Sequence, residues 1–146
     1  MPLDNLRFEP YDLPDTLVPL RAQVRGFLRA ECAPFTAAHR SNSWNAFDPE
    51  FSAKLGARGW LGMTLPKAYG GHERSALERY VVVEEVLAAG APTGFHWVAD
   101  RQSGPLIARY GTEEQKTTIL PKITAGEACF CIGMSEPNSG SDLASL

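Results

Sequence analysis

A chain of 146 residues with 44% hydrophobic and 21% charged residues has the size and composition of one globular domain with a buried core. Its formal charge of −3 argues against nucleic-acid binding. No stretch approaches the roughly 18 apolar residues of a membrane helix, so we expect no membrane insertion. Three cysteines cannot all pair, which favours a reducing compartment and a cytoplasmic location.

The N-terminal part predicts an arm followed by a helix. Residues 1–15 hold three prolines and no sustained period, so we expect an irregular arm. A helix is predicted from Thr16, which is expected to cap it, and Pro34 is expected to end it. Three arginines spaced by four residues are expected on a solvated face: Arg21, Arg25 and Arg29. The apolar stripe of the helix comprises Leu17, Leu20, Val24, Phe27 and Leu28.

The next elements are set by turn and cap residues. Residues 40–47 are polar and aromatic, and we expect a loop there. Asp48-Pro49 is a strong helix start, and the short helix that follows is expected to end near Gly59. The segments 60–66 and 67–72 contain too many breakers for a helix and predict turn-rich loops.

A third helix is predicted from Ser75 to Ala89. We expect its buried stripe to comprise Leu77, Val81, Glu84 and Ala88, with Glu84 a buried acid tied to an arginine or a backbone N–H rather than a catalytic group. A further helix is expected over residues 93–103, whose aromatic side chains favour core packing over the lining of a pocket.

The last elements predict a helix and then one strand. Gly111 is expected to cap a preceding apolar element, and Thr112 with Gln115 predicts a capping box whose helix Pro121 kinks or ends. The apolar segment 129–134 is the best strand candidate, with Cys129 and Cys131 on one face as buried small residues rather than metal ligands. The predicted fold is therefore mainly α, followed by the first strand of a β-domain.

A dense polar turn sequence forms the last fourteen residues, 133–146. Its glycines and serines can offer backbone N–H groups and hydroxyls to a polar or anionic ligand, although residue types alone favour a structural turn. No phosphate-binding loop, dinucleotide fingerprint, metal-ligand spacing or compelling Ser-His-Asp order is present.

Three landmarks resemble the acyl-CoA dehydrogenase family, in the family's order. Residues 134–142 read MSEPNSGSD, which is similar to its flavin-contacting signature. Residues 56–62 read GARGWLG, with Pro66 and YGG at 69–71. Residues 105–116 read PLIARYGTEEQK, followed by Leu120-Pro121 and Gly126-Glu127. The resemblance covers roughly residues 16–146.

The resemblance implies domains, a cofactor and a reaction. Residues 16–127 would form the family's N-terminal helical domain, and residues 128–146 would begin a middle β-domain that the chain leaves truncated. In the family a glutamate removes the α-proton of an acyl-CoA thioester, and hydride passes from the β-carbon to FAD. The implied partners are an acyl-CoA substrate, an electron-transfer flavoprotein as acceptor, and further copies in a homo-oligomer of the full-length protein.

The same resemblance assigns site residues. Ile132 and Met134 would contact the flavin through their backbone, and Ser135 would hydrogen-bond the pyrimidine edge of its ring. Gly140 and Ser141 would border cofactor and substrate, with Ser141 toward the CoA. Residues 95–102 would lie near the acyl pocket.

The catalytic base is not among the matched positions. Glu84, Glu113 and Glu127 do not fit the family's catalytic glutamate, which is expected beyond Leu146, so no catalytic residue is assigned in this chain. We therefore expect an inactive N-terminal fragment of an acyl-CoA dehydrogenase. Two alternatives remain: an oxidase or monooxygenase of the same fold, and a non-catalytic helical module that binds a partner subunit.

Overall fold

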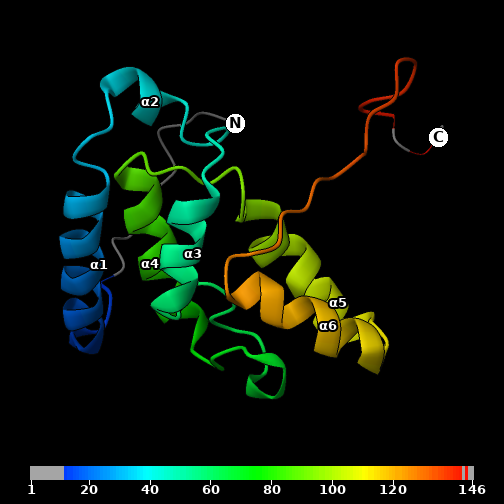
Figure 1. The fold of residues 1–146 in the computed structure, drawn as a ribbon, viewed down its shortest axis with the longest axis horizontal. Coiled ribbons are helices and arrows are strands. Elements are labelled where there is room, and N and C mark those ends of the chain that lie inside the picture. The colour runs from blue at the N-terminus through cyan, green and yellow to red at the C-terminus, as the bar shows by residue number, and fades with distance from the viewer. Residues whose placement is uncertain (1–11, 143, 145–146) are drawn as a thin grey trace, which may run out of the picture.

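The computed structural model of the protein describes residues 12–142 and 144, and its regular structure is helical (Figure 1). The predicted fold class, mainly α, is confirmed. In chain order the elements are a 3-10 turn (Asp15–Leu17), α1 (Val18–Glu31), α2 (Ala37–Ser41), α3 (Pro49–Ala57), a second 3-10 turn (Lys67–Tyr69), α4 (Ala76–Ala88), a π-helical stretch (Ala99–Ser103), α5 (Gly104–Tyr110) and α6 (Glu113–Thr124). Of the expected arm, residues 1–11 lie outside the described residues.

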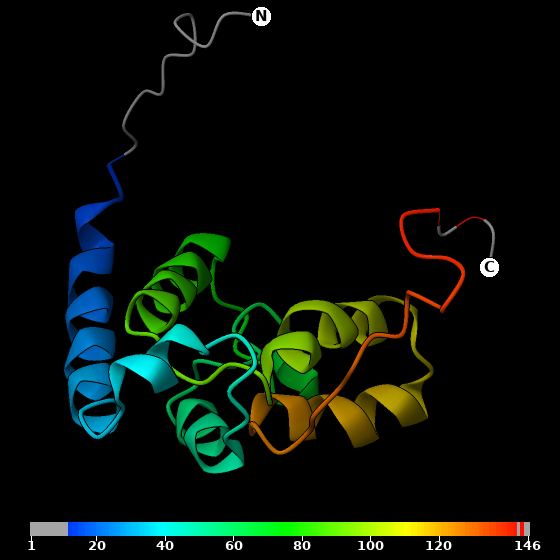
Figure 2. The ribbon, with the colours of Figure 1, turned by 90° about the horizontal axis from the view of Figure 1, so that it is seen from above.

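The helices form two neighbouring groups (Figures 1 and 2). Each group has its own apolar cluster. The larger cluster joins α1, α3 and α4, and it includes Val24, Phe27, Leu28, Phe51, Leu55, Trp60, Met63, Val82 and Val86. The smaller one links α6 to the π-helical stretch through Leu65, Ala99, Leu120 and Ile123. Within the described part of the chain, no helix is long and apolar enough to cross a membrane.

Two glycines allow the backbones of α3 and α6 to meet. A Cβ on Gly56 would lie 2.2 Å from the carbonyl oxygen of Ala125, and a Cβ on Gly126 would lie 2.2 Å from that of Ser52. Gly126 also has a φ of +74°, which favours glycine. The close approach fixes the end of α6 against the larger helical group.

The expected stripe of α1 is confirmed, but its expected cap is not. Leu17, Val24, Phe27 and Leu28 are buried. Thr16 lies inside the 3-10 turn, and Leu17 takes the cap position without a side-chain hydrogen bond. The helix ends at Glu31, three residues before Pro34.

The face of α4 that is buried differs from the expected one. Ser75 and Glu78 form a capping box, and the buried residues are Val81, Val82, Glu85 and Val86. Glu84 is half-exposed, while Leu77 is 38% exposed. The helix is rotated because Val82 and Val86 pack into the core shared with α1, which turns the carboxylate of Glu85 toward α1.

Correspondingly, the arginines of α1 do not all lie free on the solvated face that the sequence predicted. Arg21 donates from Nη1 to Glu85 Oε1 at 2.5 Å, and Arg25 donates from Nε to Glu85 Oε2 at 2.7 Å. Arg21 Nη2 also lies 2.7 Å from Glu84 Oε2, in an ion pair without hydrogen-bond geometry. The expected tie between Glu84 and an arginine is thus confirmed, and its burial only in part, because Oε2 is buried while the side chain as a whole is 38% exposed.

Two loop and helix expectations are corrected in part. Residues 37–41 form the short helix α2, capped by Thr36, which includes the first two residues of the loop expected over 40–47. The helix expected over residues 93–103 begins only at Trp97 and continues as a π-helical stretch into α5. Pro105 lies in the first turn of α5, where its missing N–H is compatible with this change of helical register.

The cap predictions that depend on local sequence are confirmed. Asp48 accepts a hydrogen bond from the N–H of Phe51 at 2.9 Å at the start of α3. Thr112 and Gln115 form the expected capping box, and α6 then runs through Pro121 as far as Thr124. Gly111 takes the cap position after α5.

The expected strand at 129–134 is absent from the described residues. This segment has no regular structure, and Cys129 and Cys131 are exposed rather than buried. A strand needs a neighbouring strand to satisfy its backbone N–H and C=O groups, and the described chain offers none. Ile132 and Met134 are accordingly 45% and 56% exposed.

Candidate functional site

The candidate loop is organised around a tight turn at residues 136–139. The N–H of Glu136 donates to the carbonyl of Ser139 at 2.7 Å, and the N–H of Ser139 donates back to the carbonyl of Glu136 at 3.2 Å. Pro137 and Asn138 form the two-residue tip, as their turn preferences favour. The Ser139 hydroxyl then donates to the carbonyl of Asp142 at 2.6 Å. The loop therefore holds its shape through its own backbone.

The predicted cofactor residues lie on and beside this turn. Ile132, Met134, Ser135, Gly140 and Ser141 are all exposed. A Cβ on Gly140 would lie 3.9 Å from the Ser135 hydroxyl oxygen, so the turn brings these two predicted residues together. The hydroxyls of Ser135 and Ser141 have no partner among the described residues, and both are free to bind a ligand.

The loop stands apart from the helical body. Ala128 and Phe130 still pack against the smaller apolar cluster. Beyond them the chain runs away from the helices in both views (Figures 1 and 2). The described residues therefore present the loop as an open face without a second wall.

The aromatic residues expected near an acyl pocket pack against the loop before α3. The ring of Trp97 lies 4.5 Å from that of Trp44, and Phe95 lies 5.1 Å from Phe47. Trp44 and Phe47 are 56% and 63% exposed. Sequence reasoning missed this pairing because the partners are about fifty residues apart; the aromatic content of 40–47 was the available signal. These rings offer an apolar surface rather than a closed cavity.

A buried Ser-His pair lies beneath this surface. Ser52 Oγ is 2.8 Å from His96 Nδ1, and Ser52 also donates to the carbonyl of Asp48 at 2.9 Å. Because a serine has one hydroxyl proton and this one is directed to the Asp48 carbonyl, we assign His96 Nδ1 as the donor to Ser52. Ser52 has no exposed surface, so the pair fixes α3 against residue 96.

Burial lowers the pKa of His96 to about 4, against a weaker opposing effect of the Asp100 carboxylate. A histidine of pKa about 6.5 in the unfolded chain therefore binds a proton more readily there than in the fold. We expect the free energy of unfolding to fall by about 3 kcal/mol as the pH drops from 6.5 to 4. Urea titrations at several pH values measure this.

The matched variant is His96→Asn, whose Nδ2 occupies the position of the histidine Nδ1, so it keeps an N–H donor for Ser52 and does not titrate. Its stability should vary less with pH between 5 and 7 than that of the parent chain. Equal slopes for the two proteins would show that His96 does not carry the effect.

Asp100 connects three segments of the fold. Its Oδ1 accepts from the N–H of Gly62 at 2.7 Å, and its Oδ2 accepts from Arg79 Nη2 at 3.0 Å. Asp100 is buried within the π-helical stretch. Both oxygens of the carboxylate thus accept hydrogen bonds, which link the π-helical stretch to α4 and to residue 62. The carboxylate is therefore not available as a base. Among the described residues, no group of three potential ligands could hold a metal ion.

Comparisons with known proteins agree on one family. The family model described as the acyl-CoA dehydrogenase N-terminal domain matches residues 15–127. Acyl-CoA dehydrogenase FadE26 of Mycobacterium tuberculosis is 36% identical over 137 residues, covering 88% of this chain and 34% of the relative. Mitochondrial isovaleryl-CoA dehydrogenase of Pongo abelii is 38% identical over 129 residues, covering 87% of this chain and 30% of the relative.

Solved structures give the same result. The Tcur3481-Tcur3483 steroid ACAD matches with a TM-score of 0.80 and 39% identity, covering 94% of this chain and 36% of that one. The ChsE4-ChsE5 complex of Mycobacterium tuberculosis matches with a TM-score of 0.78 and 34% identity, covering 94% of this chain and 35% of that one.

The chain belongs to the acyl-CoA dehydrogenase family, as the resemblance predicted. It spans about a third of the length of the curated relatives it matches.

Proposed function

We propose that this chain supplies the N-terminal helical domain and the first flavin-contacting loop of an FAD-dependent acyl-CoA dehydrogenase. The reaction is α,β-dehydrogenation of an acyl-CoA thioester to a 2-enoyl-CoA. The observation that carries the proposal is the MSEPNSGSD loop, placed directly after a domain that matches the family model. In this proposal residues 16–127 form one domain and residues 128–146 begin the next.

The donors of the loop fit a flavin edge. Ser135 has an exposed and unpartnered hydroxyl, and Gly140 beside it leaves room for close approach of a planar ring. We assign Ser135 to the pyrimidine edge, where a fixed donor stabilises negative charge on the ring. Ile132 and Met134 present backbone groups to the same ring, and Ser141 faces the CoA. FAD, when bound, accepts the hydride.

The remaining parts of the site come from elsewhere. No glutamate of residues 1–146 matches the family's proton-abstracting position, so we propose that these residues alone are inactive. Two of the matched structures are named as pairs of proteins, which supports partner subunits in an oligomer. The acceptor we propose is an electron-transfer flavoprotein. Three free cysteines favour a reducing compartment, and we propose the cytoplasm.

A chimera tests the proposed flavin contact. Residues 1–146 are fused to the part of FadE26 that follows its matching segment, so that the chain supplies the loop and the relative supplies the rest. Ser135→Ala in this chimera is expected to weaken FAD binding about 2- to 10-fold, the effect of one hydrogen bond. Fluorescence titration of the apoprotein with FAD measures it.

Thr118→Ala is the matched control, since it removes an exposed hydroxyl of α6 that lies outside the predicted site. It should leave both the FAD affinity and the KM for acyl-CoA close to those of the parent chimera. If Ser135→Ala left both FAD affinity and flavin spectrum unchanged, the assigned hydrogen bond would be wrong.

A further inference from the structure

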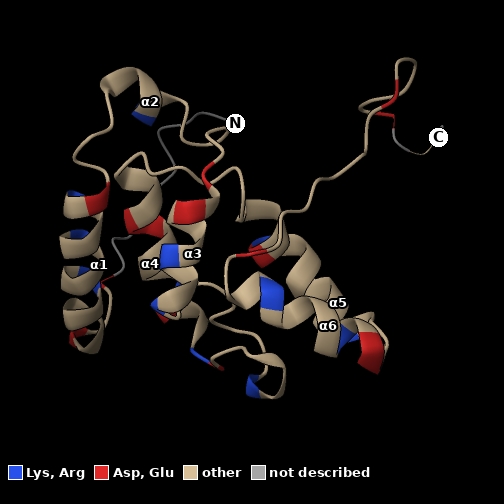
Figure 3. Ribbon diagram, in the orientation of Figure 1, with Lys and Arg blue, Asp and Glu red and all other residues tan. Residues whose placement is uncertain are grey.

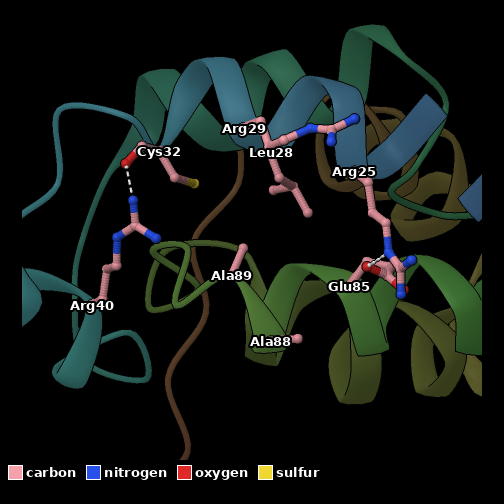
Figure 4. A pocket seen from close by; sticks show the side chains of 8 residues that line it. All are labelled: Arg25, Leu28, Arg29, Cys32, Arg40, Glu85, Ala88 and Ala89. Atoms are coloured by element: carbon pink, nitrogen blue, oxygen red, sulfur yellow. Dashed lines mark hydrogen bonds and ion pairs between the residues drawn. The ribbon is translucent and has the colours of Figure 1, made fainter. Parts of the chain in front are cut away.

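A slot between α1 and α4 lies far from the candidate loop. Its floor is apolar, made by Leu28 and Cys32 of the α1 side and by Ala88 and Ala89 at the end of α4 (Figure 4). The slot has a volume of about 340 Å³, within the range of small-ligand pockets. In both overall views α1 and the C-terminal loop lie at opposite ends of the molecule (Figures 1 and 2).

Arg40 forms one end of this slot and is held in place. Its Nη2 donates to the carbonyl of Cys32 at 2.8 Å, and its Nε donates to that of Phe35 at 3.3 Å. Within the described residues no carboxylate pairs with it. The guanidinium is thus oriented by neutral groups and keeps a full uncompensated charge, with further N–H groups available.

The other charges around the slot also leave a positive balance. Arg25, at the opposite end in Figure 4, is neutralised by Glu85. Arg29, which also lines the slot, has no partner among the described residues. Four arginines, counting Arg21, against Glu84 and Glu85 leave a formal charge of +2 on a chain whose total is −3. Figure 3 shows basic and acidic residues interspersed over the other helices.

The floor stays neutral. Burial raises the pKa of the Cys32 thiol, against a weaker lowering by Arg40, so the thiol remains protonated at neutral pH. An apolar floor beneath an unpaired guanidinium matches a ligand that has an aliphatic chain and one negative end.

We propose that this slot binds a small organic acid, with its aliphatic chain along Leu28, Cys32 and Ala88 and its carboxylate on Arg40. Arg29 adds long-range attraction. The site is separate from the proposed acyl-CoA chemistry, because it contacts none of the loop residues, and it stands whether or not the chain contributes to a flavin enzyme.

The test uses hexanoate as probe and 1-hexanol as its uncharged counterpart, both titrated into the 146-residue chain by heteronuclear NMR. Hexanoate is expected to bind saturably and to shift the amides of residues around the slot, and 1-hexanol to bind about tenfold more weakly. Arg40→Gln should weaken hexanoate binding about tenfold, while Arg40→Lys should weaken it less, since lysine keeps the charge but not the fixed donors of the guanidinium.

Two further variants separate the site from nonspecific charge effects. Ala88→Leu fills the slot from an exposed position and should abolish binding. Lys122→Gln removes an exposed positive charge on α6 and should change nothing. Equal binding of hexanoate and 1-hexanol, or an Arg40→Gln chain that binds as tightly as the parent, would overturn the proposal. Circular dichroism verifies that every variant keeps its helices.

Discussion

Replacing Asp100 with alanine is expected to lower the free energy of unfolding by about 3–5 kcal/mol, the usual effect of breaking a buried ion pair from one side. The substitution leaves the buried N–H of Gly62 without an acceptor and Arg79 without a counter-charge. Arg79 is 23% exposed, so water compensates only partly. Urea denaturation monitored by circular dichroism measures the loss.

Asp100→Asn is the matched variant, since the amide oxygen can still accept from Gly62 while the charge on Arg79 is lost. Its free energy of unfolding should lie between that of the parent chain and that of Asp100→Ala. A double variant with Arg79→Ala should recover part of the loss of Asp100→Ala, because no unpaired charge then remains. An Asp100→Ala chain within 0.5 kcal/mol of the parent would show that this carboxylate does not hold the fold.

Replacing Glu85 with alanine is expected to lower the free energy of unfolding by about 2–3 kcal/mol. Its carboxylate accepts charge-assisted hydrogen bonds from both Arg21 and Arg25, and its side chain is 8% exposed. The expected loss is smaller than for Asp100 because Arg25 is 57% exposed and is solvated once Glu85 is removed.

The neighbouring Glu84→Ala is the control for Glu85. Its side chain is 38% exposed and accepts from the Tyr80 hydroxyl at 2.8 Å, the main cause of its lowered pKa. We expect Glu84→Ala to lower the free energy of unfolding by less than about 1 kcal/mol, because the interactions of this side chain are partly exposed to solvent. A larger effect for Glu84→Ala than for Glu85→Ala would contradict the rotation of α4 described above.

Local signals predicted much of the fold. Asp48 and Thr112 cap α3 and α6 because a helix start depends on residues within one turn, which the sequence displays directly. The stripe of α1 follows from spacing alone. Glycine landmarks predicted turns, although the backbone contact of Gly56 with Ala125 depends on the final packing.

The predictions that were wrong depend on contacts between residues that are far apart in the sequence. The buried face of α4 is set by the packing of Val82 and Val86 against α1, and Glu85 then meets arginines that lie 60 and 64 residues away in the sequence. The segment 129–134 has the composition of a strand, but pairing is supplied by another segment and not by propensity. Ser52 and His96 are 44 residues apart, so nothing in their spacing marks the contact.

For the candidate loop, sequence and structure contribute different parts. Pro137 and Asn138 predict a turn, and the structure places Ser135 beside Gly140 on it. The assignment of that turn to a flavin comes from family resemblance, because exposed hydroxyls alone do not select one ligand. The position of the cofactor depends on the other parts of the binding site, which the described residues do not form.

The most direct test of the central claim is a titration of the FadE26 chimera with FAD, followed by acyl-CoA under anaerobic conditions. We predict stoichiometric FAD binding and bleaching of the flavin on addition of acyl-CoA, with 2-enoyl-CoA as product. A chimera that folds like intact FadE26 yet fails to bind FAD, when intact FadE26 binds it under the same conditions, would contradict the proposed function.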